Sequence, residues 1–238
     1  MKQKIALVTG SNKGIGFAVA KELANANYEV WIATRNSELG QKAAAELGKN
    51  VHFLSLEVTN DESVLAAAKE FASKRDHLDL LINNAGIYQS DIDGKAQSVS
   101  LKTINSTFDV NFLGPIRVTQ AFLPLVKKSE SGSILNVSSG LGSLNLQLDP
   151  STGFDQMDVF AYNASKTALN AFSVILSNEL KKNKIKVNSI CPGYVATDLN
   201  GHSGPLTTEY SAKGIMEFIL NDDFITGKFI KKDGEHLW

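Results

Sequence analysis

The chain has 238 residues, 24 basic and 25 acidic side chains with a formal net charge of −1, and a single cysteine. This length fits one α/β domain with a substantial core. The mixed charge, without long blocks of one sign, argues against nucleic acid as a partner, and one cysteine excludes an internal disulfide framework. No apolar run is long enough for a signal-peptide core or a membrane span. We therefore expect a cytoplasmic protein with no membrane partner.

The N-terminal part of the chain predicts a dinucleotide site. Residues 4–9 are an apolar run typical of a buried strand, residues 10–16 read GSNKGIG, and residues 17–25 follow a helical pattern. Strand, glycine-rich turn and helix together offer backbone N–H groups to a pyrophosphate. The spacing is G-x-x-x-G-x-G, so its place between strand and helix carries the argument. We expect contacts to the coenzyme from Gly10, Ser11, Asn12, Lys13, Gly14, Ile15 and Gly16.

Arg35 follows a second predicted strand, residues 29–34. In dinucleotide folds this position faces the adenosine ribose, where an acid binds the 2′-hydroxyl of NAD and an arginine accommodates the 2′-phosphate of NADP. Lys13 adds a second positive charge in the glycine loop. The alternative is a solvated arginine in a polar turn. We expect NADPH/NADP⁺ to be preferred over NAD.

Strands and helices alternate over the rest of the chain. Strands are predicted at residues 51–56, 78–82, 133–137, 185–190 and 228–230, and helices at residues 37–47, 59–74, 103–127, 159–180 and 212–220. Right-handed crossovers then give a doubly wound parallel sheet of about seven strands, with helices on both faces, in a single domain spanning residues 1–238. Residues 144–158 are expected to be a loop beside the substrate, and residues 198–210 a mobile lid.

Small and polar residues follow several predicted strands, at the edge where open α/β sheets bind ligands. They are NNAG at residues 83–86, Ser138 and Ser139, and Pro192 and Gly193. Within the predicted helix 103–127, Pro115 should leave the carbonyl of Asn111 unpaired and kink the helix, unless the helix simply breaks there. A water bound to that carbonyl could carry protons.

Tyr162 and Lys166 are four residues apart on the predicted helix 159–180, so they share one face. An ammonium group near a phenol favours the phenolate, and we predict that Lys166 lowers the pKa of Tyr162. Such a phenol can pass a proton to or from a substrate at physiological pH. The alternative is an ordinary surface pair.

These elements in this order resemble the short-chain dehydrogenase/reductase family over essentially the whole chain. Residues 9–16 (TGSNKGIG) resemble its cofactor loop, residues 83–86 its N-N-A-G element, and residues 192–193 its P-G element. Asn111, Ser139, Tyr162 and Lys166 match its catalytic tetrad. The glycine loop, Arg35 and residues 192–198 (PGYVATD) look most like the NADPH-dependent carbonyl reductase branch.

The resemblance implies a Rossmann-type fold and the reduction of ketone or aldehyde carbonyls by NADPH. Ser139 would hold the carbonyl oxygen and Tyr162 would donate the proton, while Lys166 would bind the nicotinamide ribose and Asn111 a relay water. It also implies coenzyme contacts from Glu57, Val58, Asn84, Ala85, Gly86, Tyr162, Lys166, Pro192, Gly193, Val195 and Thr197. No metal is implied.

Two departures from the family pattern bear on these expectations. Glu57 stands where an aspartate usually lies beside the adenine, and the stretch between Ser139 and Tyr162 is longer than is common. The longer stretch leaves a monomer or a homo-oligomer open. Two alternatives also stay open: a 3-oxoacyl-carrier-protein reductase, and an NADPH-binding regulatory protein without turnover. A hydrolase or metal enzyme is disfavoured because the chain has no G-x-S-x-G or H-E-x-x-H motif.

Overall fold

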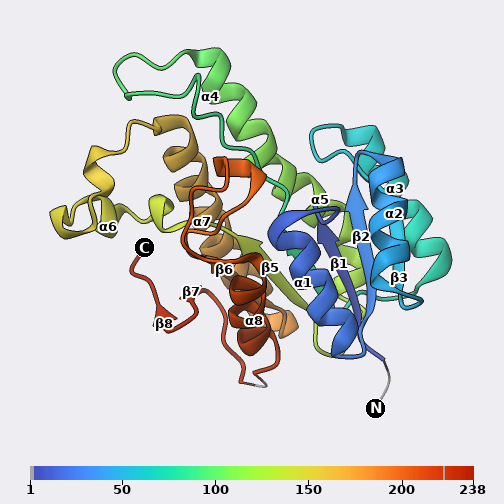
Figure 1. Ribbon diagram of the computed structural model, residues 1–238. Coiled ribbons are helices and arrows are strands. Elements are labelled where there is room, and N and C mark those ends of the chain that lie inside the picture. Colours follow the sequence, from blue (N-terminus) through green and yellow to red (C-terminus); the bar gives the residue numbers. More distant parts are fainter. Residues whose placement is uncertain (1–2, 222) are drawn as a thin grey trace.

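A central sheet organises the computed structural model, which describes residues 3–221 and 223–238 (Figure 1). Its strand order is β3-β2-β1-β4-β5-β6-β7-β8. Neighbours from β3 to β7 pair in parallel, and β8 pairs antiparallel with β7. The strands are β1 (Ile5–Thr9), β2 (Glu29–Thr34), β3 (Val51–Ser55), β4 (Leu80–Asn83), β5 (Ser133–Val137), β6 (Lys186–Ile190), β7 (Phe229–Lys231) and β8 (Gly234–Glu235).

The expected doubly wound sheet is confirmed, but the count of about seven strands is wrong, because the described residues form eight. The additional strand, β8, is only Gly234–Glu235, and both residues are exposed. A two-residue exposed strand at a sheet edge has no hydrophobic period, so the sequence pattern gave no sign of it.

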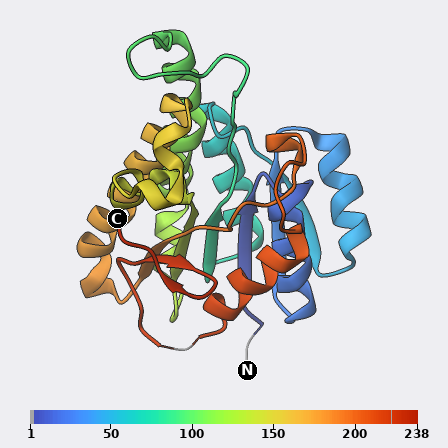
Figure 2. The same cartoon turned by 60° about the vertical axis from the view of Figure 1, so that its left-hand side comes forward.

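Helices cover both faces of the sheet, as Figure 2 shows. One apolar core joins the sheet to α3, α5 and α7, and a second joins it to α1, α2 and α8. The helices are α1 (Gly14–Asn25), α2 (Ser37–Leu47), α3 (Asp61–Lys74), α4 (Leu101–Phe108), α5 (Gly114–Val126), α6 (Leu144–Gln147), α7 (Phe160–Leu180) and α8 (Thr208–Ile219). Over the described ranges, no helix combines the length and apolar character that a membrane crossing requires.

The predicted helix 103–127 is divided by a π-helical turn. Helix α4 leads into the turn Asp109–Leu113, and α5 starts at Gly114 with a proline in its first turn. The backbone N–H of Gly114 donates to the carbonyl of Asp109, five residues earlier. The irregularity is thus a widened turn ahead of Pro115 rather than a simple kink, in keeping with the missing N–H of proline.

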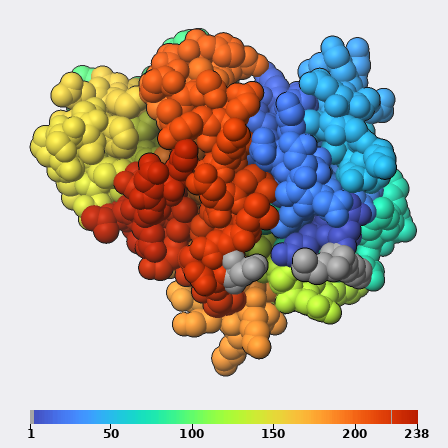
Figure 3. Space-filling model, turned by 60° about the horizontal axis from the view of Figure 1, so that its bottom comes forward, coloured from blue at the N-terminus to red at the C-terminus, as the bar shows by residue number. Residues whose placement is uncertain are grey.

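The expected loop 144–158 contains short helical turns and is attached to the last residues of the chain. It holds α6 and two 3₁₀ turns, Pro150–Thr152 and Phe154–Gln156. The N–H of Asn145 donates to the carbonyl of Trp238 (3.0 Å), whose ring stacks on Phe229 with centroids 5.5 Å apart. Figure 3 shows the C-terminal residues (red) against this segment (yellow). The segment is therefore fastened to the sheet edge.

Candidate active site

The glycine loop after β1 packs directly on the loop after β4. The Thr9 hydroxyl accepts hydrogen bonds from the backbone N–H groups of Asn84 and Ala85, both at 3.0 Å. The Asn84 amide donates to the carbonyls of Thr9 (2.9 Å) and Gly10 (3.1 Å). Gly10 has φ +63°, and a Cβ there would lie 2.8 Å from the Ala85 Cα. Glycine is needed because a side chain would both strain the backbone and separate the two loops.

The N-terminus of α1 opens onto this loop without a capping side chain. Its N-cap residue, Lys13, makes no side-chain capping bond. Gly14 has φ +62°, and the nearest atom to a Cβ built there is Thr197 Cγ2 at 3.8 Å. Uncapped N–H groups at the positive end of a helix, beside open space, suit a pyrophosphate. The residues present therefore fit a dinucleotide.

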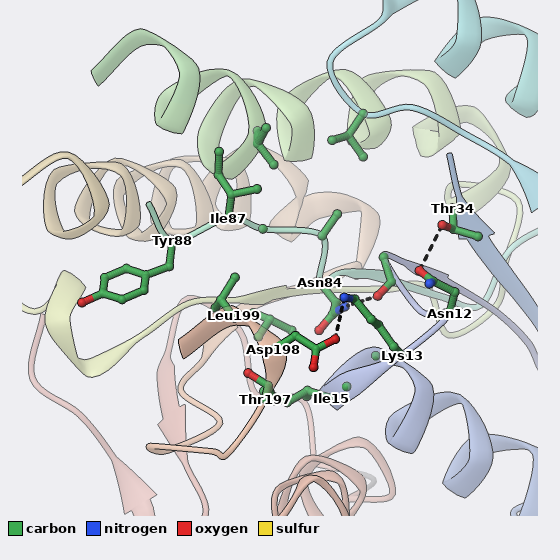
Figure 4. A pocket seen from close by; sticks show the side chains of 18 of the residues that line it. Asn12, Lys13, Ile15, Thr34, Asn84, Ile87, Tyr88, Thr197, Asp198 and Leu199 are labelled. Carbon is green, nitrogen blue, oxygen red and sulfur yellow. Dashed lines mark hydrogen bonds and ion pairs between the residues drawn. The ribbon is translucent and has the colours of Figure 1, made fainter. Parts of the chain in front are cut away.

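A cavity of about 480 Å³ is lined by residues of the glycine loop and by Tyr162 and Lys166. Figure 4 shows part of this lining, with Asn12 and Thr34 on one side and Tyr88 on the other. Most of the residues expected from the sequence line it: Gly10, Asn12, Lys13, Gly14, Ile15, Gly16, Arg35, Glu57, Val58, Asn84, Ala85, Gly86, Tyr162, Lys166, Pro192 and Thr197. The sequence did not single out five other lining residues, which are Thr34, Leu56, Ile87, Val110 and Val137, whereas Asp198 and Leu199, which also line the cavity, belong to the expected lid. Most of these are apolar or lie outside any motif, so only their position at the sheet edge could have indicated them.

Three of the expected coenzyme residues do not line this cavity. The Ser11 hydroxyl is buried and donates to the carbonyl of Val8 (2.6 Å). Gly193 lines a second, smaller cavity. Val195 is buried and forms a parallel bridge with Leu206. A side-chain contact of Ser11 with the coenzyme is therefore not favoured, because its hydroxyl already holds the end of β1.

Tyr162 and Lys166 line the far end of the cavity, as does Ser138, whereas Ser139 is not among its lining residues. The Ser139 side chain lies close enough to Tyr162 to lower the pKa of the phenol in part. The Lys166 Nζ lies 5.7 Å from the centroid of the Tyr162 ring and donates to the carbonyl of Val137 (2.9 Å). The Tyr88 ring packs edge-on against Tyr162 with centroids 5.0 Å apart. The phenol of Tyr162 thus has the Ser139 alcohol and the Lys166 ammonium group as neighbours.

The prediction that Lys166 lowers the pKa of Tyr162 is wrong for the chain without its coenzyme. Burial raises the pKa of Tyr162, and the hydrogen bond with Ser139 opposes this only in part. Burial also lowers the pKa of Lys166 to about 8. The physical reason is that both groups lose water, while the Lys166 ammonium is directed to the Val137 carbonyl rather than to the phenol oxygen.

Asn111 links the segment after β4 to helix α7. Its amide donates to the carbonyl of Ile87 (2.9 Å) and to the Ser165 hydroxyl (3.1 Å), and its oxygen accepts from the Ile87 N–H (2.8 Å). A Cβ on Gly86 would lie 3.3 Å from Asn111 Oδ1 and 3.7 Å from Lys166 Nζ. The side chain of Asn111 is thus a structural link, and the relay water on its carbonyl stays a prediction.

The lowered pKa of Lys166 has a consequence for stability. Its value falls from 10.5 to about 8 on folding, so between these values the unfolded chain binds more protons. The free energy of unfolding contributed by this group must then rise with pH in that window. We expect the wild type to gain stability relative to Lys166→Met as the pH rises from about 8, measured by denaturant unfolding. The exposed Lys102→Met variant should show no such trend, and a flat difference for Lys166→Met would contradict the shift.

Comparisons with known proteins agree on one family. Residues 4–205 match the family model described as short chain dehydrogenase. The structure of NADPH-bound carbonyl reductase from chicken fatty liver has a TM-score of 0.88 and 30% identity, with 100% of each chain covered. (-)-Isopiperitenone reductase of Mentha piperita is 30% identical, with 97% of each chain covered. Carbonyl reductase family member 4 of Xenopus laevis is likewise 30% identical, with 97% of each chain covered.

The family model spans most of the chain, and these likenesses extend over its whole length. They confirm the resemblance read from the motifs and explain why the glycine loop and the group around Tyr162 share one cavity. The chain therefore belongs to the short-chain dehydrogenase/reductase family of oxidoreductases.

Proposed function

We propose that the chain reduces ketone or aldehyde carbonyls to alcohols with NADPH. The observation that carries the proposal is that Tyr162 and Lys166, with Ser139 beside the phenol, lie in a cavity that the glycine loop also lines. The printed names of the chicken and Xenopus relatives, both carbonyl reductases, support the same reaction class.

The coenzyme would lie along this cavity, with its pyrophosphate on the N-terminus of α1. Lys13 and Arg35 line the end nearest α1 and β2, where an adenosine 2′-phosphate would be held. Lys166 would bind the ribose at the other end, since its Nζ lies beside Gly86. When bound, the coenzyme supplies the hydride.

The chain's own residues supply position and the proton. Ser139 would donate a hydrogen bond to the substrate carbonyl oxygen, and Tyr162 would transfer its phenolic proton to that oxygen as negative charge develops there. The raised pKa of Tyr162 keeps the phenol protonated in readiness for this transfer. Residues 144–158 would border the substrate, and residues 198–210 would close over the cavity.

A carbonyl panel tests this proposal. Purified protein would be assayed for NADPH and NADH oxidation with aldehydes, ketones and 3-oxoacyl thioesters. We expect oxidation with aldehydes or ketones. Turnover confined to the thioesters would favour the 3-oxoacyl-carrier-protein reductase, and coenzyme binding without any turnover would favour the regulatory protein.

Arg35→Asp tests the assignment of the 2′-phosphate. It replaces a phosphate partner with a repelling charge, and we expect NADPH affinity to fall about 100-fold, near 2.7 kcal/mol, with little change for NADH. Dissociation constants from fluorescence titration give both values. Lys49→Asp, which makes the same change of charge at an exposed position after α2, is the control. Equal losses for the two coenzymes would defeat the assignment.

A further inference from the structure

Each cation at the adenosine end of the cavity has a carboxylate beside it. Arg35 Nη1 lies 3.5 Å from Glu57 Oε2, and Lys13 Nζ lies 2.6 Å from Asp198 Oδ2. All four residues line the same cavity. Figure 4 shows the bond between Lys13, on the glycine loop, and Asp198, in the segment after β6. Two positive and two negative charges therefore line the same cavity, and they cancel formally.

Both carboxylates are held in place by further hydrogen bonds. Glu57 Oε1 accepts from the Thr59 hydroxyl at 3.0 Å, which leaves Oε2 for Arg35. Asp198 Oδ1 contacts His202 Nε2 at 2.8 Å, which leaves Oδ2 for Lys13. Hydrogen bonds to Lys13 and His202 lower the pKa of Asp198, so this carboxylate stays ionised at neutral pH. The negative charges are thus fixed parts of the site.

A 2′-phosphate held by Lys13 and Arg35 would lie within a few ångströms of these carboxylates. A phosphate monoester carries close to two negative charges at neutral pH, so each carboxylate repels it. The 2′-hydroxyl of NADH is neutral and can donate a hydrogen bond to a carboxylate, as acids near this ribose do in NAD-binding folds. The same two side chains should therefore weaken the binding of NADPH but not the binding of NADH.

We propose that Glu57 and Asp198 are selectivity-determining residues that offset Arg35 and Lys13 and reduce the preference of this chain for NADPH over NADH. The inference rests on the proposed coenzyme site and refines it. It gives Glu57 a role different from the adenine contact that the family resemblance implies. It also assigns a role to Asp198, which the sequence placed only in the segment 192–198 and the expected lid.

Glu57→Gln and Asp198→Asn test the inference, because each removes a charge and keeps the shape. Dissociation constants for NADPH and NADH would be measured by fluorescence titration for each variant. We expect the ratio of the NADH to the NADPH constant to rise about five- to tenfold per variant, the order expected for charges a few ångströms apart near water. High salt should reduce the gain, and more for Asp198→Asn than for Glu57→Gln, since Asp198 is 54% exposed and Glu57 is 29% exposed.

Glu46→Gln is the matched control, since it removes a charge from an exposed position near the end of α2. An unchanged or lowered ratio in both variants would overturn the inference. If Glu57→Gln weakens the binding of NADPH and of NADH equally, Glu57 contacts the adenine that both coenzymes share. That result would overturn its role in selectivity. Melting temperatures should change little, because exposed ion pairs contribute little to stability.

Binding separates this inference from the proposed reaction. If both coenzymes bind with the expected ratios but no carbonyl is reduced, the proposed reaction fails and the inference stands. If carbonyls are reduced but the ratios do not move, the inference fails and the reaction stands. If neither coenzyme binds, both fail.

Discussion

Tyr162→Phe is expected to lower kcat about 10²- to 10⁴-fold while leaving the NADPH dissociation constant unchanged. Positioned proton transfer contributes a rate factor of this order, and the substitution removes only the hydroxyl. The remaining ring keeps its edge-on packing with Tyr88, at 5.0 Å between centroids, so the site should retain its shape. Steady-state NADPH oxidation with the best substrate from the carbonyl panel gives kcat, and fluorescence titration gives the coenzyme affinity.

Tyr28→Phe is the control for this experiment. It removes the same hydroxyl group from a tyrosine in the turn before β2, and Tyr28 does not line the main cavity. We expect wild-type kcat from it. Wild-type kcat in Tyr162→Phe would show that another group donates the proton.

Gly142→Ala is expected to lower both kcat and the melting temperature. Gly142 ends the 3₁₀ turn that follows Ser139, and this turn lies against α7. A Cβ on Gly142 would lie 2.7 Å from the Lys166 carbonyl carbon and 2.8 Å from its Cβ. Because backbone atoms cannot rotate away, the turn or the helix must shift, and a displacement of about 1 Å in a catalytic group can cost about 100-fold in rate.

The hydrogen bonds at this turn make the prediction specific. The Gly142 carbonyl accepts from the hydroxyl of Thr167 (3.0 Å) and the amide of Asn170 (3.2 Å), and both would be disturbed by a shift. Gly94→Ala is the control, since no atom lies within 4 Å of a Cβ there. Steady-state kinetics and thermal unfolding would measure both variants. Unchanged kcat and melting temperature in Gly142→Ala would mean that the close packing of the turn on α7 is not needed.

Most of the strands were predictable because they are short apolar runs that are largely buried. The strands at Glu29–Thr34 and Ser133–Val137 have the bounds that the sequence predicted. The expected helix 103–127 was less predictable. Its helical pattern continues through the π turn at Asp109–Leu113, since one extra residue in one turn hardly alters the period. Short turns such as those in residues 144–158 have no period to detect.

The sequence predicted that Tyr162 and Lys166 lie near each other, but it did not predict their electrostatics. Residue spacing predicted that Tyr162 and Lys166 share a helix face, and both line the cavity. Spacing could not show that the Lys166 ammonium donates to the Val137 carbonyl, which comes from another element. It also could not measure burial, which raises the pKa of Tyr162.

The sequence by itself determined most of the sheet, the glycine loop and the candidate catalytic residues, because local apolar period and motif order reflect interactions between near neighbours. Only the tertiary structure decided which charges meet. Lys13 and Asp198 are 185 positions apart, yet their side chains lie 2.6 Å from each other. Electrostatic attraction depends on the distance between two charges in space and on the exclusion of water. Neither quantity can be read from the positions of the residues along the chain.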